Sequence, residues 1–367
     1  MNNMRKLLTA LLCLTLLCSF AMAANAEELA AANVEKATKA ATMTYDELLA
    51  AAKEEGQVSS VGMPPEWANW KDLWAQLESL GIKTTDTDMS SAEELARFAL
   101  KDQAEADIGD IGLALTGYAV DNDMLLPYKT TSWDSIPDWA KQADGKWIEA
   151  YTCTTAFITD LENVDKAPTS WKELLEGNYK VCIGDVEKAS QAYNGVLACA
   201  VALGGSETNL QPALDAFAKL AKDGRLNTSN PQVANLENGE IEVAVVWDFN
   251  AMGYRDQIQK DRFAVTIPTD GAVTSGYASV INKYAKNPYA AMLAREIMLS
   301  DAGQNYLALG YARPIREDVV LSDEAKAHIL DASQYTNTYK IADQTAWAST
   351  VEQLPTLWQE QVSVYMN

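Results

Sequence analysis

The chain contains few of the residues on which enzyme catalysis and metal binding commonly depend. His328 is its only histidine, and no two cysteines have the Cys-x-x-Cys spacing. A histidine-based triad and a multi-histidine metal site are therefore excluded. A Gly-x-Ser-x-Gly segment, the nucleophile turn of α/β hydrolases, is also absent. We accordingly expect no catalytic residue, no metal site and no cofactor.

Basic residues are scarce as well. Lys and Arg number 29 against 51 Asp and Glu, which gives a formal net charge of −22 at pH 7. A chain this acidic will not bind nucleic acid or an anionic membrane surface through charge. Its acids are scattered over the expected helix faces, as is typical of a solvated surface.

A long apolar run occurs only at the start of the chain. The segment "MNNMRKLLTALLCLTLLCSFAMAANAEE" has a basic beginning, an apolar stretch to about Phe20, and then small residues. The apolar stretch is too short to span a bilayer, and Ala23 and Ala26 each complete an A-x-A cleavage site. We predict a signal peptide over residues 1–26, cleaved after about Ala23 or Ala26, and export to the periplasm.

Cysteine is too rare for a disulfide framework. Removal of the signal leaves Cys153, Cys182 and Cys199, which permits at most one bridge. Cys182 and Cys199 fall on a neighbouring strand and helix, so a bridge between them is geometrically possible. Cys153 lies in an apolar strand, and we predict that it is a free, buried thiol.

The rest of the chain alternates between helical and strand patterns. Thr44 and Glu47 predict a capping box for the first helix, and Ser91 and Glu94 predict another for a later helix. The strands expected in the first half are 57–62, 81–88 and 106–115. Strands separated by helices are typical of a parallel, doubly wound layer. A second α/β unit follows, with strands expected at 151–160, 179–185, 241–247, 262–268 and 274–282.

Four stretches of this sequence carry a family resemblance. They are "GIKTTDTDMSSAEELARF", "LENVDKAPTSWKELLEGNYKVCIGD", "GEIEVAVVWDFNA" and "YASVINKYAKNPYAAMLAREIMLSDAGQNYLALGYARPI". The last combines a strand, a Lys-Asn-Pro helix start, "LS-x-x-GQ" and "G-Y-x-x-P". The chain resembles the family 1 extracellular solute-binding proteins of ABC importers, in the branch that includes polyamine, ferric-iron, thiamine and phosphonate binders.

The resemblance implies the type II periplasmic-binding-protein fold, with two doubly wound α/β lobes joined by two crossing segments near 152–158 and 274–281. The implied divisions are a signal peptide over 1–26, lobe 1 over 27–153 plus 276–320, lobe 2 over 154–275, and C-terminal helices over 321–367. It further implies a monomer without enzyme activity. Such a protein closes its lobes on a small-molecule solute and delivers it to a cognate ABC permease in the membrane.

Ligands of open parallel sheets bind beyond the carboxyl ends of the strands, where helices begin. Several corners of the sequence, the return strand and the final loop meet this description. We therefore expect the solute to contact Met63, Glu66, Trp67, Ser91, Gly112, Tyr118, Ser190, Gln191, Tyr193, Trp247, Asp248, Asn250, Ser275, Tyr277 and Arg313.

The corner of Trp247 and Asp248 has two possible roles. Trp247 can line the crevice or belong to the core, and Asp248 can meet the solute or cap the helix that follows. In the first case Asp248→Asn weakens binding while stability hardly changes, because asparagine caps a helix about as well as aspartate.

The resemblance also bears on the solute. Polyamine binders share the tryptophan at Trp247, but their other aromatic and acidic positions match Ser275, Tyr277, Gln191 and Asn194 here. Ferric-iron binders have adjacent tyrosines, which this chain lacks. The turn "KASQAYNG" is similar to the serine-rich turn of phosphonate and sugar-phosphate binders.

We therefore expect a small organic anion or zwitterion, phosphonate-like or carboxylate-like. The alternatives are a polyamine or other small amine, ferric iron, and an exported hydrolase. A two-carboxylate glycosidase belongs to that last class, because composition alone does not exclude it.

Overall fold

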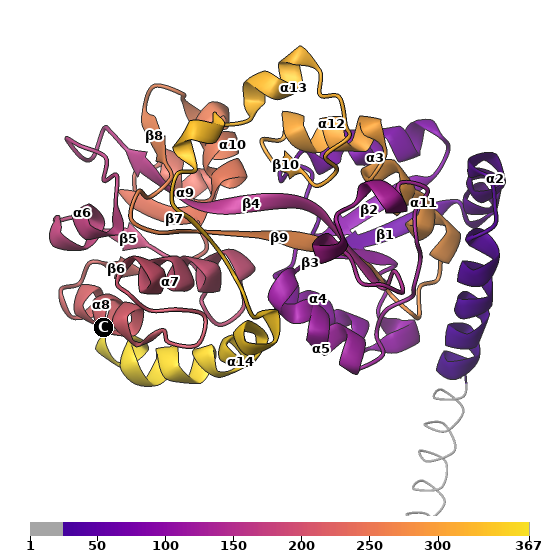
Figure 1. The fold of residues 1–367 in the computed structure, drawn as a ribbon, viewed down its shortest axis with the longest axis horizontal. Helices are drawn as coiled ribbons and strands as arrows, with labels where there is room; N and C mark the ends of the chain where they lie inside the picture. Colours follow the sequence, from indigo (N-terminus) through magenta and orange to yellow (C-terminus); the bar gives the residue numbers. More distant parts are fainter. Residues whose placement is uncertain (1–24, 367) are drawn as a thin grey trace, which may run out of the picture.

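The computed structural model describes residues 25–366 and divides into two α/β lobes (Figure 1). One mixed sheet runs through both lobes, in the strand order β2-β1-β3-β9-β4-β7-β5-β6. The expected two-lobe α/β fold is thus confirmed. The expected signal peptide lies outside the described residues, apart from its last two positions.

Lobe 1 contains a parallel β1–β2–β3 layer, with antiparallel β9 beside β3. Its elements include a helix over 25–40, α2 (Tyr45–Glu55), β1 (Gln57–Val61), α3 (Trp70–Ser79), β2 (Lys83–Thr87), α4 (Ser91–Phe98), β3 (Ile108–Gly112), the 3₁₀ turn η2 (Leu113–Leu115), α5 (Thr116–Asp121), α11 (Pro288–Met298), α12 (Asp301–Leu309) and β10 (Arg313–Pro314). The apolar stripe of α3 is buried at helical spacing, through Trp70, Leu73, Trp74 and Leu77.

Lobe 2 repeats the alternation of strands and helices. Its elements include α6 (Trp171–Glu176), β5 (Val181–Cys182), α7 (Ser190–Ala202), α8 (Gln211–Lys222), β6 (Leu226–Asn227), α9 (Val233–Glu237), β7 (Val243–Trp247), α10 (Asp248–Ile258) and β8 (Phe263–Thr266). α7 is buried from Ser190 to Ala200 because it packs against both α8 and the sheet. A helix that is apolar on all sides fits this interior position.

Two long strands cross between the lobes, β4 (Trp147–Asp160) and β9 (Ala272–Ile281) (Figure 1). They pair antiparallel, and the pairing extends from Trp147 opposite Val280 to Thr154 opposite Thr274. The crossing segments expected at 152–158 and 274–281 lie inside these strands.

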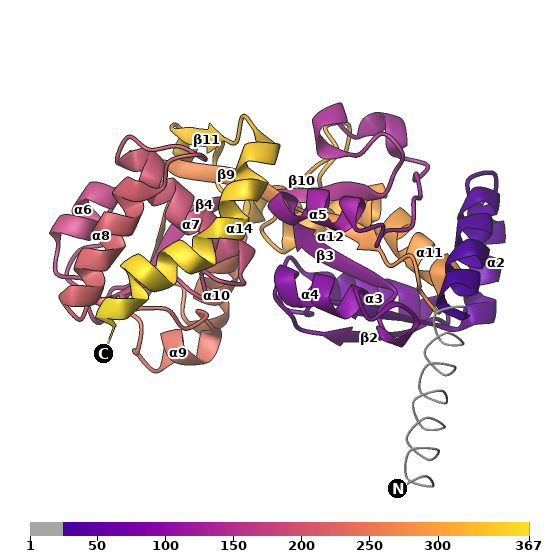
Figure 2. The same ribbon diagram turned by 90° about the horizontal axis from the view of Figure 1, so that it is seen from below.

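The C-terminal part of the chain forms a third connection. α13 (Asp323–His328) packs on α12 of lobe 1, and β11 (Thr338–Lys340) pairs with β9. α14 (Gln344–Gln361) then lies along lobe 2, where it packs on α8, and it also contacts η2 of lobe 1 (Figure 2). The last helix therefore touches both lobes.

The expected capping box of Thr44 and Glu47 is confirmed, but that of Ser91 and Glu94 is wrong by one residue. Ser90 and Glu93 make the box at the start of α4. The helix therefore begins one residue earlier, and Glu94 is free to point inward. This shift has consequences for the site.

The three cysteines within residues 25–366 are free and buried, so Cys153 is the buried thiol that the sequence predicts and Cys182 and Cys199 form no bridge. Burial raises the pKa of the Cys182 thiol to about 11. The Cys182 thiol donates instead to the carbonyl oxygen of Ser229.

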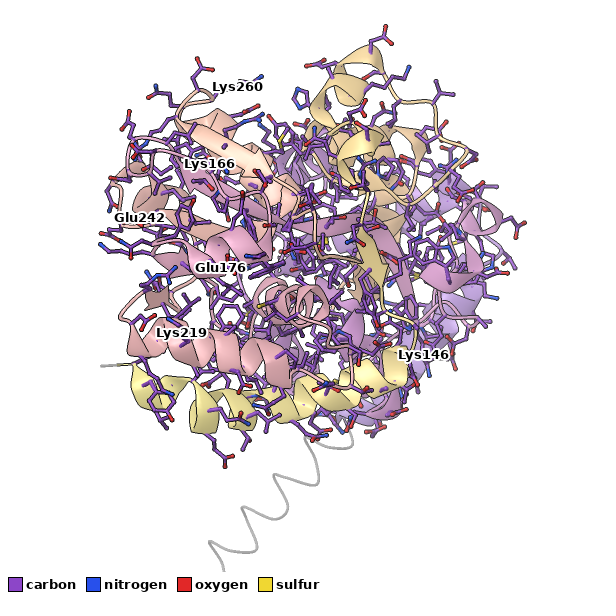
Figure 3. The ribbon with its side chains drawn as sticks, turned by 60° about the vertical axis from the view of Figure 1, so that its left-hand side comes forward. Lys146, Lys166, Glu176, Lys219, Glu242 and Lys260 are labelled. Atoms are coloured by element: carbon purple, nitrogen blue, oxygen red, sulfur yellow. The ribbon has the colours of Figure 1, made fainter. Side chains whose placement is uncertain are left out.

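Charged side chains on the outer surface extend into solvent. Figure 3 shows Lys166, Glu176 and Lys219 on lobe 2, and each of these side chains is about 70% exposed. Such exposed pairs contribute little to stability. Over residues 25–366, every helix is too short or too polar to cross a bilayer.

Candidate functional site

A cavity of about 610 Å³ lies between the lobes. Its size suits a small organic molecule. Lobe 1 contributes the loops after β1 and β2 together with α4 and β3. Lobe 2 contributes the start of α7, the loop 230–232 with the start of α9, and α10, while Tyr277 comes from the crossing strand β9. These are the strand ends and helix starts at which the sequence predicts a ligand.

The walls of the cavity are strongly acidic. The carboxylates that line it are Glu66, Asp88, Glu93, Glu94, Asp110 and Asp185, and Lys188 is the one basic residue among the described lining residues. Five of the six acids belong to lobe 1. The lobe 1 wall therefore favours a positively charged group on the ligand.

Glu94 is the most enclosed of these acids, with 1% of its surface exposed. Its Oε2 accepts a hydrogen bond from the backbone N–H of Asp110 at 3.0 Å. Space for the carboxyl exists because two neighbours are glycine: a Cβ at Gly62 would lie 2.1 Å from Glu94 Oε1, and one at Gly109 would lie 2.6 Å from Oε2. Burial, and then the charge of Asp110, raises the pKa of Glu94 well above its usual range.

Asp110 lies on β3 and is 3% exposed. Its Oδ2 accepts a hydrogen bond from the hydroxyl of Tyr151 at 2.9 Å, while its buried Oδ1 has no hydrogen-bond partner among the described residues. Burial raises the pKa of Asp110 to about 8, although the bond from Tyr151 opposes the shift. A buried carboxylate oxygen without a donor is costly, and Asp110 lines the cavity.

The lobe 2 wall has a different character. It begins at the N-terminus of α7, where the first backbone N–H groups have no partner within the helix. Ser190 and Gln191 start this helix, and Lys188 precedes it. A helix start with a nearby lysine attracts negative charge. The two walls therefore favour opposite charges.

Aromatic rings lie between the walls. The ring of Tyr277 stacks on that of Tyr151, with centroids 5.8 Å apart, and its hydroxyl accepts a hydrogen bond from Trp247 Nε1 at 3.0 Å. Trp67 packs edge-to-face on Phe249 at 6.4 Å. Aromatic faces attract cations, so this floor complements the acidic wall.

The lobes touch each other around the cavity. Lys188 Nζ of lobe 2 lies 3.6 Å from Glu93 Oε1 of lobe 1. The side chains of Trp67 in lobe 1 and Tyr254 in lobe 2 both line the cavity and interact with each other. Gly112 faces Ser190 so closely that a Cβ on Gly112 would lie 2.3 Å from Ser190 Oγ. These contacts describe a closed arrangement of the lobes.

The structure brings several of the residues expected at the solute to the cavity. Those that line it are Glu66, Trp67, Ser91, Ser190, Gln191, Asn250 and Tyr277. Ser91 also accepts the backbone N–H of Gly112 through its hydroxyl at 3.0 Å, which ties α4 to the end of β3. Solute contact by these side chains remains a prediction.

The other expected residues do not line the cavity: Met63, Gly112, Tyr118, Tyr193, Trp247, Asp248, Ser275 and Arg313. Met63 is fully buried in the core of lobe 1, whereas Tyr118 lies on α5 and is 55% exposed. Ser275 pairs with Cys153 inside the sheet, and Tyr193 packs on Trp347 of α14.

Asp248 is held by the protein on both carboxylate oxygens. Oδ1 accepts the backbone N–H groups of Thr154 at 3.0 Å and Phe249 at 2.9 Å, and Oδ2 accepts the hydroxyl of Tyr335 at 2.7 Å. Arg313 stacks over the ring of Tyr335, with its guanidinium carbon 4.1 Å from the ring centre. Asp248 thus joins α10, the crossing strand β4 and the C-terminal connection.

Glu94 and Asp110 line the cavity but were not among the residues expected at the solute. The capping pattern assigned Glu94 to a helix cap, and the apolar pattern of 106–115 placed Asp110 in an ordinary strand. The available signal was an acid inside the apolar strand "ADIGDIGLAL", since a buried acid without a basic partner commonly has a function. Within residues 25–366, no group of three or more His, Cys, Asp or Glu side chains is arranged to hold a metal ion.

Solved structures share this fold. The periplasmic binding protein AfuA from Actinobacillus pleuropneumoniae, solved with fructose-6-phosphate, superposes with a TM-score of 0.70 at 16% identity, over 84% of this chain and 98% of that one. A periplasmic thiamin-binding protein gives 0.68 at 16% identity, over 83% and 96%. The apo ferric ion-binding protein A of Pasteurella haemolytica gives 0.62 at 16% identity, over 85% and 99%.

The curated relatives found by sequence match a smaller share of the chain than the solved structures do. The sulfate-binding protein of Salmonella typhimurium is 23% identical over 190 residues, which is 48% of this chain and 57% of that protein. The chain thus spans little more than half the length of the curated relatives it matches. Residues 82–349, most of the chain, match the family of bacterial extracellular solute-binding proteins. Because this match covers most of the chain, the chain belongs to the family of bacterial extracellular solute-binding proteins.

Proposed function

We propose that this protein captures a small organic zwitterion in the cleft between its lobes and delivers it to the permease of an ABC importer. The observation that carries the proposal is the separation of charge across the cleft. Five carboxylates crowd the lobe 1 wall, whereas the lobe 2 wall holds the start of α7 with Lys188 and a single carboxylate, Asp185. An ammonium group fits the first wall, and a carboxylate or phosphonate fits the second.

A solute with only negative charge fits this cleft poorly. It would meet six carboxylates and one lysine, and that lysine already lies beside Glu93. Like charges at such distances cost binding free energy unless a cation intervenes. Of the anion or zwitterion expected from the sequence, we therefore propose the zwitterion.

A small amine without an anionic group is the second candidate. The excess of carboxylates in the lining favours it, as does the aromatic floor of Tyr277 and Trp67. It would leave the N–H groups at the start of α7 to water. Ferric iron and hydrolysis have no comparable support in the lining.

Hinge closure would complete the binding cycle. The lobes are linked by β4, β9 and the C-terminal connection, so each lobe can move nearly as a rigid body. Closure would bring Lys188 to Glu93 and Trp67 to Tyr254, as in the present arrangement. X-ray scattering should give a smaller radius of gyration with solute than without it.

Native mass spectrometry of the exported protein as purified tests the solute class directly, because a closed cleft can retain its solute. We expect a retained molecule that carries both an amine and an acid group. Calorimetry then compares the affinities of ω-amino acids with those of alkylamines and carboxylates of the same chain length. The comparison shows how much each charged group of the solute contributes to binding. A retained sugar phosphate or inorganic anion, with tight binding of carboxylates that lack an amine, would refute the zwitterion.

A further inference from the structure

We propose that Glu94 and Asp110 together form the cation subsite of the cleft, and that this pair exchanges a bound proton for the ammonium group of the solute. The inference rests on the proposed function and deepens it. It assigns the positive group of the solute to two specific side chains, and it predicts that binding releases a proton.

The protein encloses both carboxyls of the pair. Glu94 and Asp110 are 1% and 3% exposed, yet both line the cavity. Gly62 and Gly109 leave the space that the Glu94 carboxyl occupies. A Cβ at either position would lie within 2.6 Å of a carboxyl oxygen, so an alanine there would force the Glu94 side chain to shift.

One carboxylate oxygen of the pair has no hydrogen-bond donor among the described residues. Asp110 Oδ1 is buried without a hydrogen-bond donor, whereas its Oδ2 is bonded to Tyr151. Within residues 25–366, neither Glu94 nor Asp110 forms an ion pair with a basic side chain. A proton or a ligand ammonium is the donor that would satisfy this oxygen.

The groups that interact with the pair bring no positive charge to it. The titratable groups that interact with the pair are Asp86, Asp88, Tyr151, Tyr193, Tyr277 and Cys153. None of these is cationic. Farther along the cleft wall, Glu66 and Glu93 add negative charge, and Lys188 lies beside Glu93. Two adjacent buried carboxyls without a cation cannot both ionise cheaply, so one holds a proton when the cleft has no ammonium.

The charge balance of the exchange is simple. In the empty cleft the pair carries at most one negative charge, and one carboxyl O–H supplies the missing donor. When an ammonium enters, that proton leaves to solvent, and the ammonium N–H groups donate to the ionised oxygens. Binding therefore releases up to one proton, and affinity falls as the solution becomes more acidic.

Melting of solute-free protein tests the proton without any ligand. Burial raises the pKa of Asp110 to about 8 in the folded chain, and in the unfolded chain the value is about 3.9. An acid whose pKa is higher in the folded chain than in the unfolded chain stabilises the fold most at low pH, and this contribution is lost as pH rises through about 8. We expect the melting temperature of the wild type to fall from pH 5 to pH 8, and to fall less in Asp110→Asn and Glu94→Gln. Exposed Glu352→Gln serves as the matched control and should keep the wild-type slope.

Binding tests the ammonium. With 4-aminobutyrate and putrescine as probes, together with any amine retained on purification, Asp110→Asn should lower affinity at least tenfold. Calorimetry in two buffers of different protonation enthalpy should show proton release in the wild type only. If the melting temperature depends on pH in both variants as it does in the wild type, the pair does not hold the proposed proton, even if the solute proves zwitterionic. The variants could change the pH dependence of the melting temperature as expected while Ca²⁺, and no amine, stabilises the protein. That result would overturn the ammonium assignment.

Discussion

A buried aspartate lies in the middle of β3 and another directly follows β7, and the two differ in one respect that separates their roles. Asp110 and Asp248 are 3% and 2% exposed. Asp248 receives donors on both oxygens from three parts of the chain, whereas Asp110 leaves Oδ1 without a partner. A fully bonded buried carboxylate stabilises the fold. A partly bonded one that lines a cavity is suited to a ligand.

The largest expected effect concerns Asp248. Asp248→Ala leaves the N–H groups of Thr154 and Phe249 and the hydroxyl of Tyr335 without their acceptor in a buried site. We expect the free energy of unfolding to fall by roughly 3 kcal/mol. Urea denaturation of solute-free protein measures this change, with surface Asp223→Ala as the control. A stable Asp248→Ala that fails to bind would erase the distinction between the two aspartates.

Gly112→Ala should act on closure rather than on folding. The φ of Gly112 is −59°, which alanine adopts readily, but the new Cβ would lie 2.3 Å from Ser190 Oγ and 2.8 Å from Tyr193 Oη of the other lobe. Overpacking of this kind costs about 1–3 kcal/mol, so affinity should fall about tenfold while the melting temperature of solute-free protein changes little.

Gly117→Ala is the matched control for that change, because nothing lies within 4 Å of the Cβ it would add. Calorimetry with the solute identified on purification compares the two variants. Equal affinity of Gly112→Ala and Gly117→Ala would mean that solute binding does not require the observed contact between the lobes.

Tyr335→Phe isolates one bond of the Asp248 cluster. It removes the hydroxyl that donates to Oδ2 at 2.7 Å and leaves the ring under Arg313. We expect a loss of about 1 kcal/mol in stability and little change in the backbone bonds to Oδ1. Thermal melting, with Tyr365→Phe at the surface as reference, measures it. A loss as large as that of Asp248→Ala would assign the whole effect to the C-terminal connection.

The smallest expected effect belongs to Lys188→Ala. The side chain is 52% exposed and lies 3.6 Å from an exposed glutamate, so stability should change by less than about 1 kcal/mol. Affinity for a zwitterion should fall a few-fold, and added salt should reduce the difference. Lys180→Ala, whose lysine faces Glu242 away from the cleft, is the control. An increase in affinity would favour a simple amine over a zwitterion.

Much of the fold follows from short-range patterns. The Thr44 capping box, the α3 stripe and the strand patterns each depend on neighbouring residues and match the observed elements. The same patterns place the cleft at the strand ends, where Trp67, Ser190 and Asn250 do line it. The one-residue error at Ser91 shows the limit, because two adjacent serines are each followed three positions later by a glutamate, and local rules fit both equally well.

The two α/β units, the acidic balance and the family resemblance could all be predicted from the sequence, since they depend on composition, periodicity and order along the chain. The roles of individual acids could not, because they depend on tertiary contacts. Hydrogen-bond donors from distant segments decide whether a carboxylate is fully bonded within the protein or keeps an oxygen for a ligand. Tyr335 lies 87 positions from Asp248, and Tyr151 lies 41 from Asp110. Those donors are brought together by packing of the whole chain, and no local pattern encodes which oxygen they leave unpaired.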